Sequence, residues 1–202
     1  NPSLNLRLLT ADASTIGAAS ISHGENVLTY QKIVEMIPNL VPNMKQALLI
    51  GQGAGHMATT LERKSIRTDT IEIDPAVAEA ARDYFDFVPT GQTLIGDARY
   101  EIRKLKGSYD LVILDVFTGG SEPVHLLTLE TLEQIKTLLT PDGLLALNFV
   151  AFFEEGQNTA LASVAKTLAQ SFTHQLAFIS EPDHAFNDFI FIASRQPLTI
   201  EQ

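Results

Sequence analysis

Four polar groups stand at the ends of predicted strands in this sequence, at positions typical of a ligand site. They are the glycine loop from Gly51 to Gly55, the pair Glu72 and Asp74, Asp97, and Asp115. The runs that precede them are typical of buried strands. Ligands of open α/β sheets bind beyond the carboxyl ends of the strands. We therefore expect these residues to meet in one pocket.

The glycine loop, Gly51-Gln52-Gly53-Ala54-Gly55, allows close approach of the backbone to a ligand. It is followed by His56, where the dinucleotide-binding fingerprint has its third small residue. No Lys-Ser or Lys-Thr pair follows, so the loop is not a P-loop either. The pattern favours a ligand without a diphosphate, and the alternative is a tight strand–helix turn that binds nothing.

The spacing of the carboxylates indicates a nucleoside. Glu72 lies 21 residues after Gly51, close to the spacing at which an acidic side chain binds ribose hydroxyls. With Asp97, it describes a pocket for an adenosine such as that of S-adenosylmethionine. Asp115 could contact the ligand or accept a proton. The alternatives are a solvated carboxylate at Glu72, a helix N-cap at Asp97 and a loop cap at Asp115.

Apolar runs that alternate with amphipathic stretches must position these groups. Such alternation predicts βαβ units and a mostly parallel sheet. The expected strands are 47–50, 68–73, 93–95, 111–114, 144–149, 175–179 and 189–193, the last two forming a hairpin. The expected helices are 55–63, 75–84, 98–105, 128–139 and 158–171.

The first 45 residues have a different pattern. Leu4–Thr10 and Thr15–Ile21 are expected to form a small antiparallel pair, and Leu28–Ile37 a helix that ends before Pro38. We therefore divide the chain into residues 1–45, a β-hairpin and helix that act as a lid or edge, and residues 46–202, a nucleoside-binding domain.

Composition excludes several classes of protein. Lys and Arg number 14 against 24 Asp and Glu, which gives a net charge of −10 and makes nucleic acid an improbable partner. The chain has no cysteine, which excludes disulfides, thiolate metal sites and a Cys nucleophile. No His pair has ligand spacing, so no metal is expected. The longest apolar stretch, residues 144–153, is half a membrane span, and we expect a soluble, cytoplasmic domain.

Several motifs together resemble those of the polyamine aminopropyltransferases, the spermidine synthase family. The similarity runs from about Leu4 to the C-terminus and is greatest to the spermidine synthase-like domains of membrane-fused members. The motifs are Leu-Leu-Ile-Gly-Gln-Gly-Ala-Gly (48–55), Ile-Glu-Ile-Asp-Pro (71–75), Ile-Gly-Asp-Ala-Arg (95–99), Tyr-Asp-Leu-Val-Ile-Leu-Asp (109–115), the segment from Asp115 to Thr128, and Leu-Thr-Pro-Asp-Gly-Leu-Leu (139–145).

The resemblance implies a fold, a reaction and a site. The fold would be a class I S-adenosylmethionine-dependent methyltransferase-like (Rossmann-like) α/β domain with a seven-stranded sheet. A polyamine nitrogen would attack the carbon beside the sulfonium of decarboxylated S-adenosylmethionine and release methylthioadenosine. Asp115 would deprotonate the amine, and Tyr30 would line the acceptor pocket. The residues implied to bind the donor are Gly51, Gln52, Gly53, Gly55, Glu72 for the ribose, Ile73, Asp97 and Ala98 for the adenine edge, and Asp115.

The sequence also departs from the family pattern at the amine-binding positions. Ala54 stands where the family has an acidic residue for the donor amine, Thr118 replaces a second family Asp, and Ile16 aligns with a family Gln. Glu122 is a candidate replacement for the lost charge. We therefore expect an amine acceptor other than putrescine.

Two other functions stay open. One is an S-adenosylmethionine-dependent methyltransferase, which the missing acid at Ala54 favours. The other is a non-catalytic domain that binds an adenosyl ligand. Two further expectations rest on the resemblance: a homodimer through the edge strand of the N-terminal hairpin, and a membrane-spanning segment in a longer parent chain from which this chain would be excised.

Overall fold

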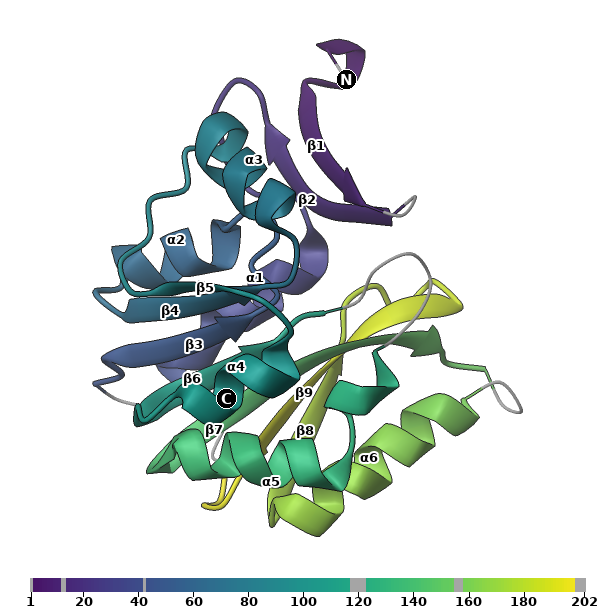
Figure 1. The fold of residues 1–202 in the computed structure, drawn as a ribbon. Helices are drawn as coiled ribbons and strands as arrows, with labels where there is room; N and C mark the ends of the chain where they lie inside the picture. Colours follow the sequence, from purple (N-terminus) through teal and green to yellow (C-terminus); the bar gives the residue numbers. More distant parts are fainter. Residues whose placement is uncertain (1, 12–13, 42, 117–122, 155–157, 199–202) are drawn as a thin grey trace.

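A seven-stranded sheet forms the centre of the computed structural model, which describes residues 2–11, 14–41, 43–116, 123–154 and 158–198 (Figure 1). The strand order is β5-β4-β3-β6-β7-β9-β8, and only β9 runs antiparallel to its neighbours. The predicted mostly parallel α/β fold is confirmed. The strands are β3 Gln46–Ile50, β4 Arg67–Glu72, β5 Thr93–Ile95, β6 Tyr109–Leu114, β7 Leu139–Phe152, β8 His174–Ile179 and β9 Phe186–Ser194.

Six α-helices in the described residues cover the two faces of this sheet. One face carries α1 Thr29–Met36, α2 His56–Arg63 and α3 Pro75–Phe85, and the other carries α4 Ala98–Lys104, α5 Leu129–Leu138 and α6 Thr159–Ser171 (Figure 1).

The central strands are apolar on both faces because helices cover both. In β3, Leu48 and Ile50 pack in the hydrophobic cluster that includes α5 and α6. The alternate residues, Ala47 and Leu49, pack in a second cluster with α1 and α2. A parallel sheet that is buried on both faces requires such continuous apolar strands.

Polar residues at the strand ends begin the following helices. Asp74 accepts a hydrogen bond from the backbone N–H of Ala76 at 2.8 Å and caps α3, which has Pro75 in its first turn. Asp97 accepts one from the N–H of Arg99 at 2.8 Å and caps α4. These caps fix where the chain leaves the sheet, and hence the position of the neighbouring carboxylates.

The N-terminal hairpin is a separate two-stranded sheet of β1 Leu6–Ala11 and β2 Ser14–Ser20. It lies against the glycine loop, where a Cβ added to Gly17 would come within 2.4 Å of the Cβ of Ala54. The Arg7 guanidinium also lies 6.0 Å from the ring centroid of Phe85 in α3. Within residues 1–45, α1 instead packs on the main sheet through Val34. The division at residue 45 stays a prediction.

Two strands are longer than the sequence predicts. Strand β7 begins at Leu139 rather than Leu144, because a register shift against β6 accommodates the Thr-Pro-Asp-Gly segment that reads as a turn. It also extends past Phe149 to Phe152, where it pairs with the start of β9. Strand β9 accordingly begins at Phe186 instead of Phe189. These three extra residues of β9 bring a polar side chain, Asp188, into the sheet.

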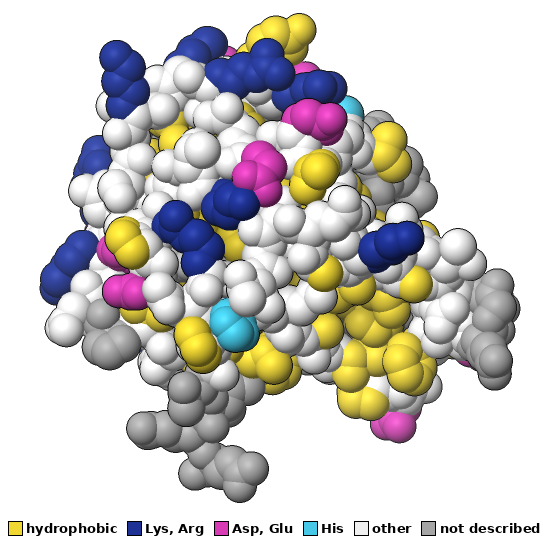
Figure 2. Space-filling view, turned by 90° about the horizontal axis from the view of Figure 1, so that it is seen from below, with side chains coloured by type: hydrophobic (Ala, Val, Ile, Leu, Met, Phe, Trp, Pro, Cys, Tyr) yellow, Lys and Arg dark blue, Asp and Glu magenta, His cyan; other side chains and the backbone are white. Residues whose placement is uncertain are grey.

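The acidic excess is not spread evenly over the surface. The face shown in Figure 2 carries many Lys and Arg side chains among fewer Asp and Glu, although the net charge is −10. None of the helices in the described part of the chain is both long and apolar enough to cross a bilayer.

Candidate active site

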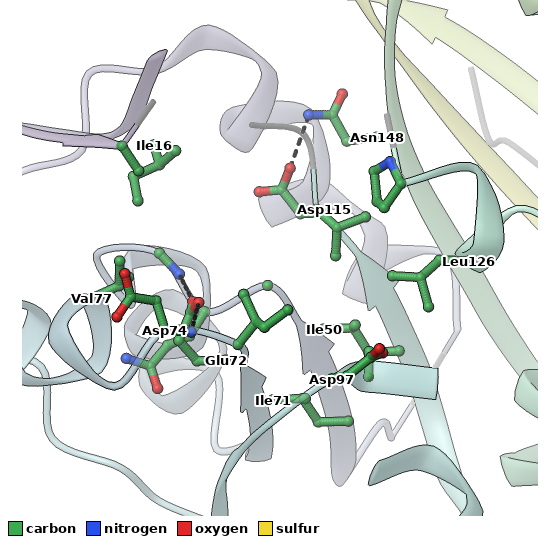
Figure 3. A pocket seen from close by; sticks show the side chains of 18 of the residues that line it. Ile16, Ile50, Ile71, Glu72, Asp74, Val77, Asp97, Asp115, Leu126 and Asn148 are labelled. Atoms are coloured by element: carbon green, nitrogen blue, oxygen red, sulfur yellow. Dashed lines mark hydrogen bonds between the residues drawn. The ribbon is translucent and has the colours of Figure 1, made fainter. Parts of the chain in front are cut away.

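A cavity of about 320 Å³ lies beyond the carboxyl ends of β3, β4 and β6, under the N-terminal hairpin (Figure 3). Most of the predicted site residues line it. They are Tyr30, Gly51, Gln52, Gly53, Glu72, Ile73, Asp97, Ala98 and Asp115. Gly55 does not: a Cβ there would lie 2.4 Å from the Phe87 ring, so this glycine faces the protein interior at the start of α2.

The glycine loop touches the loop that follows β6. A Cβ on Gly51 would lie 1.8 Å from the backbone oxygen of Asp115, and the φ of Gly51 is +88°. Both the space and the backbone conformation require glycine there. A Cβ on Gly53 would similarly meet the backbone oxygen of Ile16, at 2.7 Å. The close approach that the sequence predicts is therefore made to the protein itself, on two sides.

Glu72 is buried and held by backbone amides. Its carboxylate accepts hydrogen bonds from the N–H groups of Gly53 and Asp74, both at 3.1 Å, and its exposed fraction is 7%. Burial raises the pKa of Glu72 above its usual value, although these hydrogen bonds oppose the change. A carboxylate has lone pairs for more than two donors, so Glu72 can still accept hydroxyl groups of a ligand.

The cavity walls near Glu72 are mostly apolar. Ile73 is 70% exposed yet lines the cavity, as does Leu126 (labelled in Figure 3). Asp97 lies at the rim, where its carboxylate is 3.9 Å from Nε2 of His125. Apolar walls with two carboxylates at their edges suit a flat base joined to a hydroxylated sugar. We call this part of the cavity the nucleoside end; it comprises Glu72, Ile73, Asp97, Ala98 and Leu126.

The opposite end of the cavity is built around Asp115. Its carboxylate accepts a hydrogen bond from Oη of Tyr30 at 2.9 Å. It accepts a second one from Nδ2 of Asn148 at 3.0 Å (Figure 3). Burial raises the pKa of Asp115 to about 6, against the effect of both donors. A carboxyl with this pKa is a stronger base than an ordinary Asp and is still ionised near neutral pH.

Three residues at this end were missed by the sequence analysis. Gln31 donates from Nε2 to Oη of Tyr30 at 3.1 Å, and Asn148 also donates to Asp188 at 3.2 Å. We call Tyr30, Gln31, Asp115, Asn148 and Asp188 the acceptor end; all five line the cavity. The sequence does distinguish Asn148, because it is a polar residue within a long apolar stretch. Asp188 had none, because it precedes the predicted start of its strand.

Of the positions at which the sequence departs from the family pattern, some line the cavity and others do not. Ala54 is 3% exposed and is not among the residues that line the cavity; it lies against Gly17 of the hairpin. Ile16 does line the cavity, from the hairpin side (Figure 3). Thr118 and Glu122 lie outside the described residues. Ala54 therefore packs against the hairpin rather than on the cavity wall.

Two histidines, His125 and His56, occur in the segments near the site, and only His125 lines the cavity. His125 lines the cavity near Asp97. His56 is 8% exposed, packs edge-on against Phe85 with ring centroids 5.6 Å apart, and lies outside the cavity. No three His, Asp or Glu side chains of the described ranges are placed to share a metal ion.

The sheet order and the nucleoside end define a Rossmann-like domain of the class I methyltransferase type. The family model of the spermine/spermidine synthase domain matches residues 28–183. The chain belongs to this family, and the matched residues include most of those that line the cavity.

The chain is similar to two curated proteins with different activities. The chain is 40% identical over 114 residues to a polyamine aminopropyltransferase of Vibrio vulnificus, a match to 53% of this chain and 38% of that protein. It is 39% identical over 108 residues to an N-terminal histidine N-methyltransferase of Emericella nidulans, which covers 51% of this chain and 19% of that protein. The chain thus spans less than half the length of each.

Solved structures share the fold at lower identity. A probable spermidine synthase from Corynebacterium glutamicum superposes with a TM-score of 0.81 at 20% identity, over 96% of this chain and 74% of that one. Human methyltransferase-like protein 13, solved in complex with SAH, gives a TM-score of 0.69 at 20% identity, over 85% of this chain and 84% of that one.

Proposed function

We propose that this chain transfers the aminopropyl group of decarboxylated S-adenosylmethionine to an amine nitrogen. The observation that carries the proposal is the position of Asp115, a buried carboxylate with a raised pKa at one end of a cavity whose other end suits a nucleoside. The Vibrio vulnificus relative, a polyamine aminopropyltransferase, supports the same reaction.

The reaction needs a base at this position. An amine with a pKa of about 10 is protonated at neutral pH and is no nucleophile until it loses a proton. Asp115 accepts that proton, the nitrogen attacks the carbon beside the sulfonium, and the carbon–sulfur bond breaks with its electron pair on sulfur. Methylthioadenosine is the leaving group. The hydrogen bonds from Tyr30 and Asn148 hold the carboxylate in place during this step.

The nucleoside end holds the donor. Glu72 accepts the ribose hydroxyls, Asp97 and the backbone of Ala98 bind the adenine edge, and Ile73 covers the base. The glycine loop, Gly51 to Gly53, borders the sulfonium. These roles agree with the burial of Glu72 and with the exposed position of Ile73 on the cavity wall.

The charge of the cavity favours a donor without a carboxylate. No Lys or Arg is among the described residues that line it, and the charged side chains there are acidic: Glu72, Asp74, Asp97, Asp115 and Asp188. Decarboxylated S-adenosylmethionine carries only positive charges, on the sulfonium and the amine. S-Adenosylmethionine adds a carboxylate, which this field repels.

A second candidate is methyl transfer from S-adenosylmethionine to an amine. The buried Ala54 favours it, because no acid at that position faces the donor amine. The Emericella nidulans relative, an N-terminal histidine N-methyltransferase, also transfers its group to nitrogen. Asp115 would serve as the base in either reaction.

The first experiment is calorimetric titration of the domain with decarboxylated S-adenosylmethionine, S-adenosylmethionine and methylthioadenosine in parallel. Tighter binding of the decarboxylated donor than of its parent is expected, since the cavity is acidic. The matched turnover assay separates released methylthioadenosine from released S-adenosylhomocysteine by chromatography, with a panel of amines as acceptors.

Each outcome has a distinct meaning. Preference for S-adenosylmethionine with release of S-adenosylhomocysteine makes the chain a methyltransferase. Binding of methylthioadenosine without turnover on any amine favours a non-catalytic domain. If none of the three ligands binds, the glycine loop is only a turn and the proposal fails.

A further inference from the structure

Seven of the 14 Lys and Arg residues lie at the edge of the sheet where three neighbouring strands begin. They belong to the segments that lead into β3, β4 and β6, which are adjacent in the sheet. The cavity lies beyond the opposite ends of the same strands. We call these seven exposed side chains the basic edge: Lys45, Arg63, Lys64, Arg67, Arg103, Lys104 and Lys106.

Backbone hydrogen bonds hold the three segments of the basic edge together. The backbone oxygen of Lys45 accepts a hydrogen bond from the N–H of Arg67, the first residue of β4, at 2.9 Å. The N–H of Lys45 donates to the carboxylate of Asp110, in β6, at 2.7 Å. Lys45 therefore lies between the other two segments, and the seven cations belong to one surface.

The basic edge differs in charge from the rest of the chain. The same segments and strand starts contain four carboxylates, Glu62, Asp69, Glu101 and Asp110, so this edge has a net charge of +3. The remaining seven Lys and Arg stand against 20 Asp and Glu, which gives the rest of the chain a net charge of −13. The molecule is therefore strongly polarised along the direction of its strands.

Contacts within the fold account for only part of this positive charge. Arg67 and Lys104 pair with buried carboxylates, at 3.4 and 2.7 Å. Helix dipoles favour cations at the ends of α2 and α4, where Arg63 and Arg103 lie. Lys45 and Lys106 belong to no helix, and neither forms an ion pair with another described residue. Stability of the fold alone gives no reason for cations at those positions.

The breadth of the basic edge suits an extended anionic surface rather than a small anion. A cavity of about 350 Å³ lies at the same edge of the sheet, near Asn43 and Ser194, but no Lys or Arg is among the described residues that line it. The cations instead extend from α2 on one face of the sheet to α4 on the other (Figure 1). They thus span the thickness of the domain.

The acidic remainder of the chain favours a lipid bilayer over a nucleic acid. A nucleic acid strand follows the surface of a protein and would meet the repulsion of the acidic part, whereas a planar bilayer touches one edge only. Proteins that bind single strands also stack bases on aromatic side chains. Among the described residues, no exposed aromatic side chain lies within residues 63–67 or 103–106.

We propose that the basic edge binds the anionic headgroups of a lipid bilayer, with the cavity facing away from the membrane. Repulsion between the headgroups and the acidic part of the chain fixes this orientation. Because the attraction is between exposed charges, it is reversible and weakens with salt. The basic edge lies at the far end of the strands from the cavity, so its role does not depend on the proposed function.

The test is co-sedimentation of the chain with vesicles of phosphatidylcholine and phosphatidylserine, and with vesicles of phosphatidylcholine alone. The chain should bind the mixed vesicles at about 0.1 M salt, where the Debye length is about 10 Å, and dissociate at about 1 M, where it is about 3 Å. It should not bind phosphatidylcholine alone. Methylthioadenosine should bind the vesicle-bound chain with an unchanged Kd, because the cavity faces the solvent.

A pair of double variants assigns the binding to the basic edge. Each Lys near an anionic surface adds about fivefold in affinity, so Lys45→Gln with Lys106→Gln should weaken vesicle binding by about 20–30-fold. Lys32→Gln with Lys166→Gln is the matched control, because it removes the same charge from exposed positions in α1 and α6. The control should bind the mixed vesicles as wild type does, and both variants should keep the Tm of wild type.

Four results would overturn the proposal. They are no binding to the mixed vesicles at low salt, equal binding to phosphatidylcholine alone, equal losses in the two double variants, and loss of methylthioadenosine binding on the vesicles. Binding to RNA or polyglutamate that is lost in Lys45→Gln with Lys106→Gln, without binding to vesicles, would assign the basic edge to another polyanion and also overturn it.

Discussion

The two ends of the cavity are held in place by different kinds of interaction. At the nucleoside end, backbone N–H groups bind the carboxylates: Glu72 accepts from Gly53 and Asp74, and Asp97 accepts from Arg99. At the acceptor end, side chains bind one another, and Asn148 alone contacts two carboxylates. A site built on backbone groups keeps its frame when a neighbouring side chain changes. A site built from side chains changes its chemistry with each substitution, which suits the end that we propose to bind the acceptor.

The substitution with the largest expected effect, Asp115→Asn, should damage the acceptor end alone. Loss of a general base lowers kcat by roughly 10²–10⁴-fold. Steady-state turnover and calorimetry with methylthioadenosine measure the two ends separately. Nucleoside binding should stay within a few-fold of wild type. A residual rate within about tenfold of wild type would remove Asp115 from the role of base.

Gly51→Ala should damage both ends, because it acts at their junction. The new Cβ would meet the backbone oxygen of Asp115 at 1.8 Å, and φ at this position is +88°. The strain and the clash together should cost roughly 3 kcal/mol, seen as a fall in Tm of about 6–12 °C.

Gly24→Ala is the control for backbone strain. Gly24 also has a positive φ, +69°, but a Cβ there meets nothing within 4 Å. Its Tm should fall by about 2–4 °C, the equivalent of ~1 kcal/mol. Equal losses in the two variants would mean that the contact between Gly51 and Asp115 contributes nothing.

Glu72→Gln should damage the nucleoside end alone. It removes the charge but keeps the shape, and should weaken methylthioadenosine by about 10–100-fold in Kd. A ligand that lacks the 2′-hydroxyl provides the second arm of a double-mutant cycle. If Glu72 binds the ribose, the substitution and the missing hydroxyl will not be additive. Additive losses would place Glu72 away from the sugar.

The pH dependence of kcat should give a smaller effect and report on the acceptor end. Burial raises the pKa of Asp115 to about 6, and the nearby Asp188 raises it further, while Tyr30 and Asn148 lower it. The base must be ionised, so kcat should rise about tenfold per pH unit below pH 6 and level off above it. Removal of one donor in Tyr30→Phe should shift this midpoint upward. A midpoint that does not move would show that Asp115 is not the group that titrates.

The same difference between the ends explains what the sequence could predict. Glu72 is the last residue of β4 and Asp97 lies just past the end of β5, and the parallel βαβ pattern is enough to place both at one edge of the sheet. Asp188 depends on the register between β7 and β9, and on a strand that begins at Phe186 in a segment without a strand pattern. Gln31 depends on how α1 packs on the sheet. Such long-range pairings are set by tertiary packing, which the local pattern does not encode.

The contact between Gly17 and Ala54 makes the hairpin and the glycine loop depend on each other's sequence. A Cβ at position 17 would be 2.4 Å from the Cβ of Ala54 and 3.3 Å from its backbone nitrogen. Any side chain at position 17 therefore requires β2 to move away from the loop. Because Ile16, the neighbour of Gly17, lines the cavity, such a movement would also change the wall of the cavity on the hairpin side.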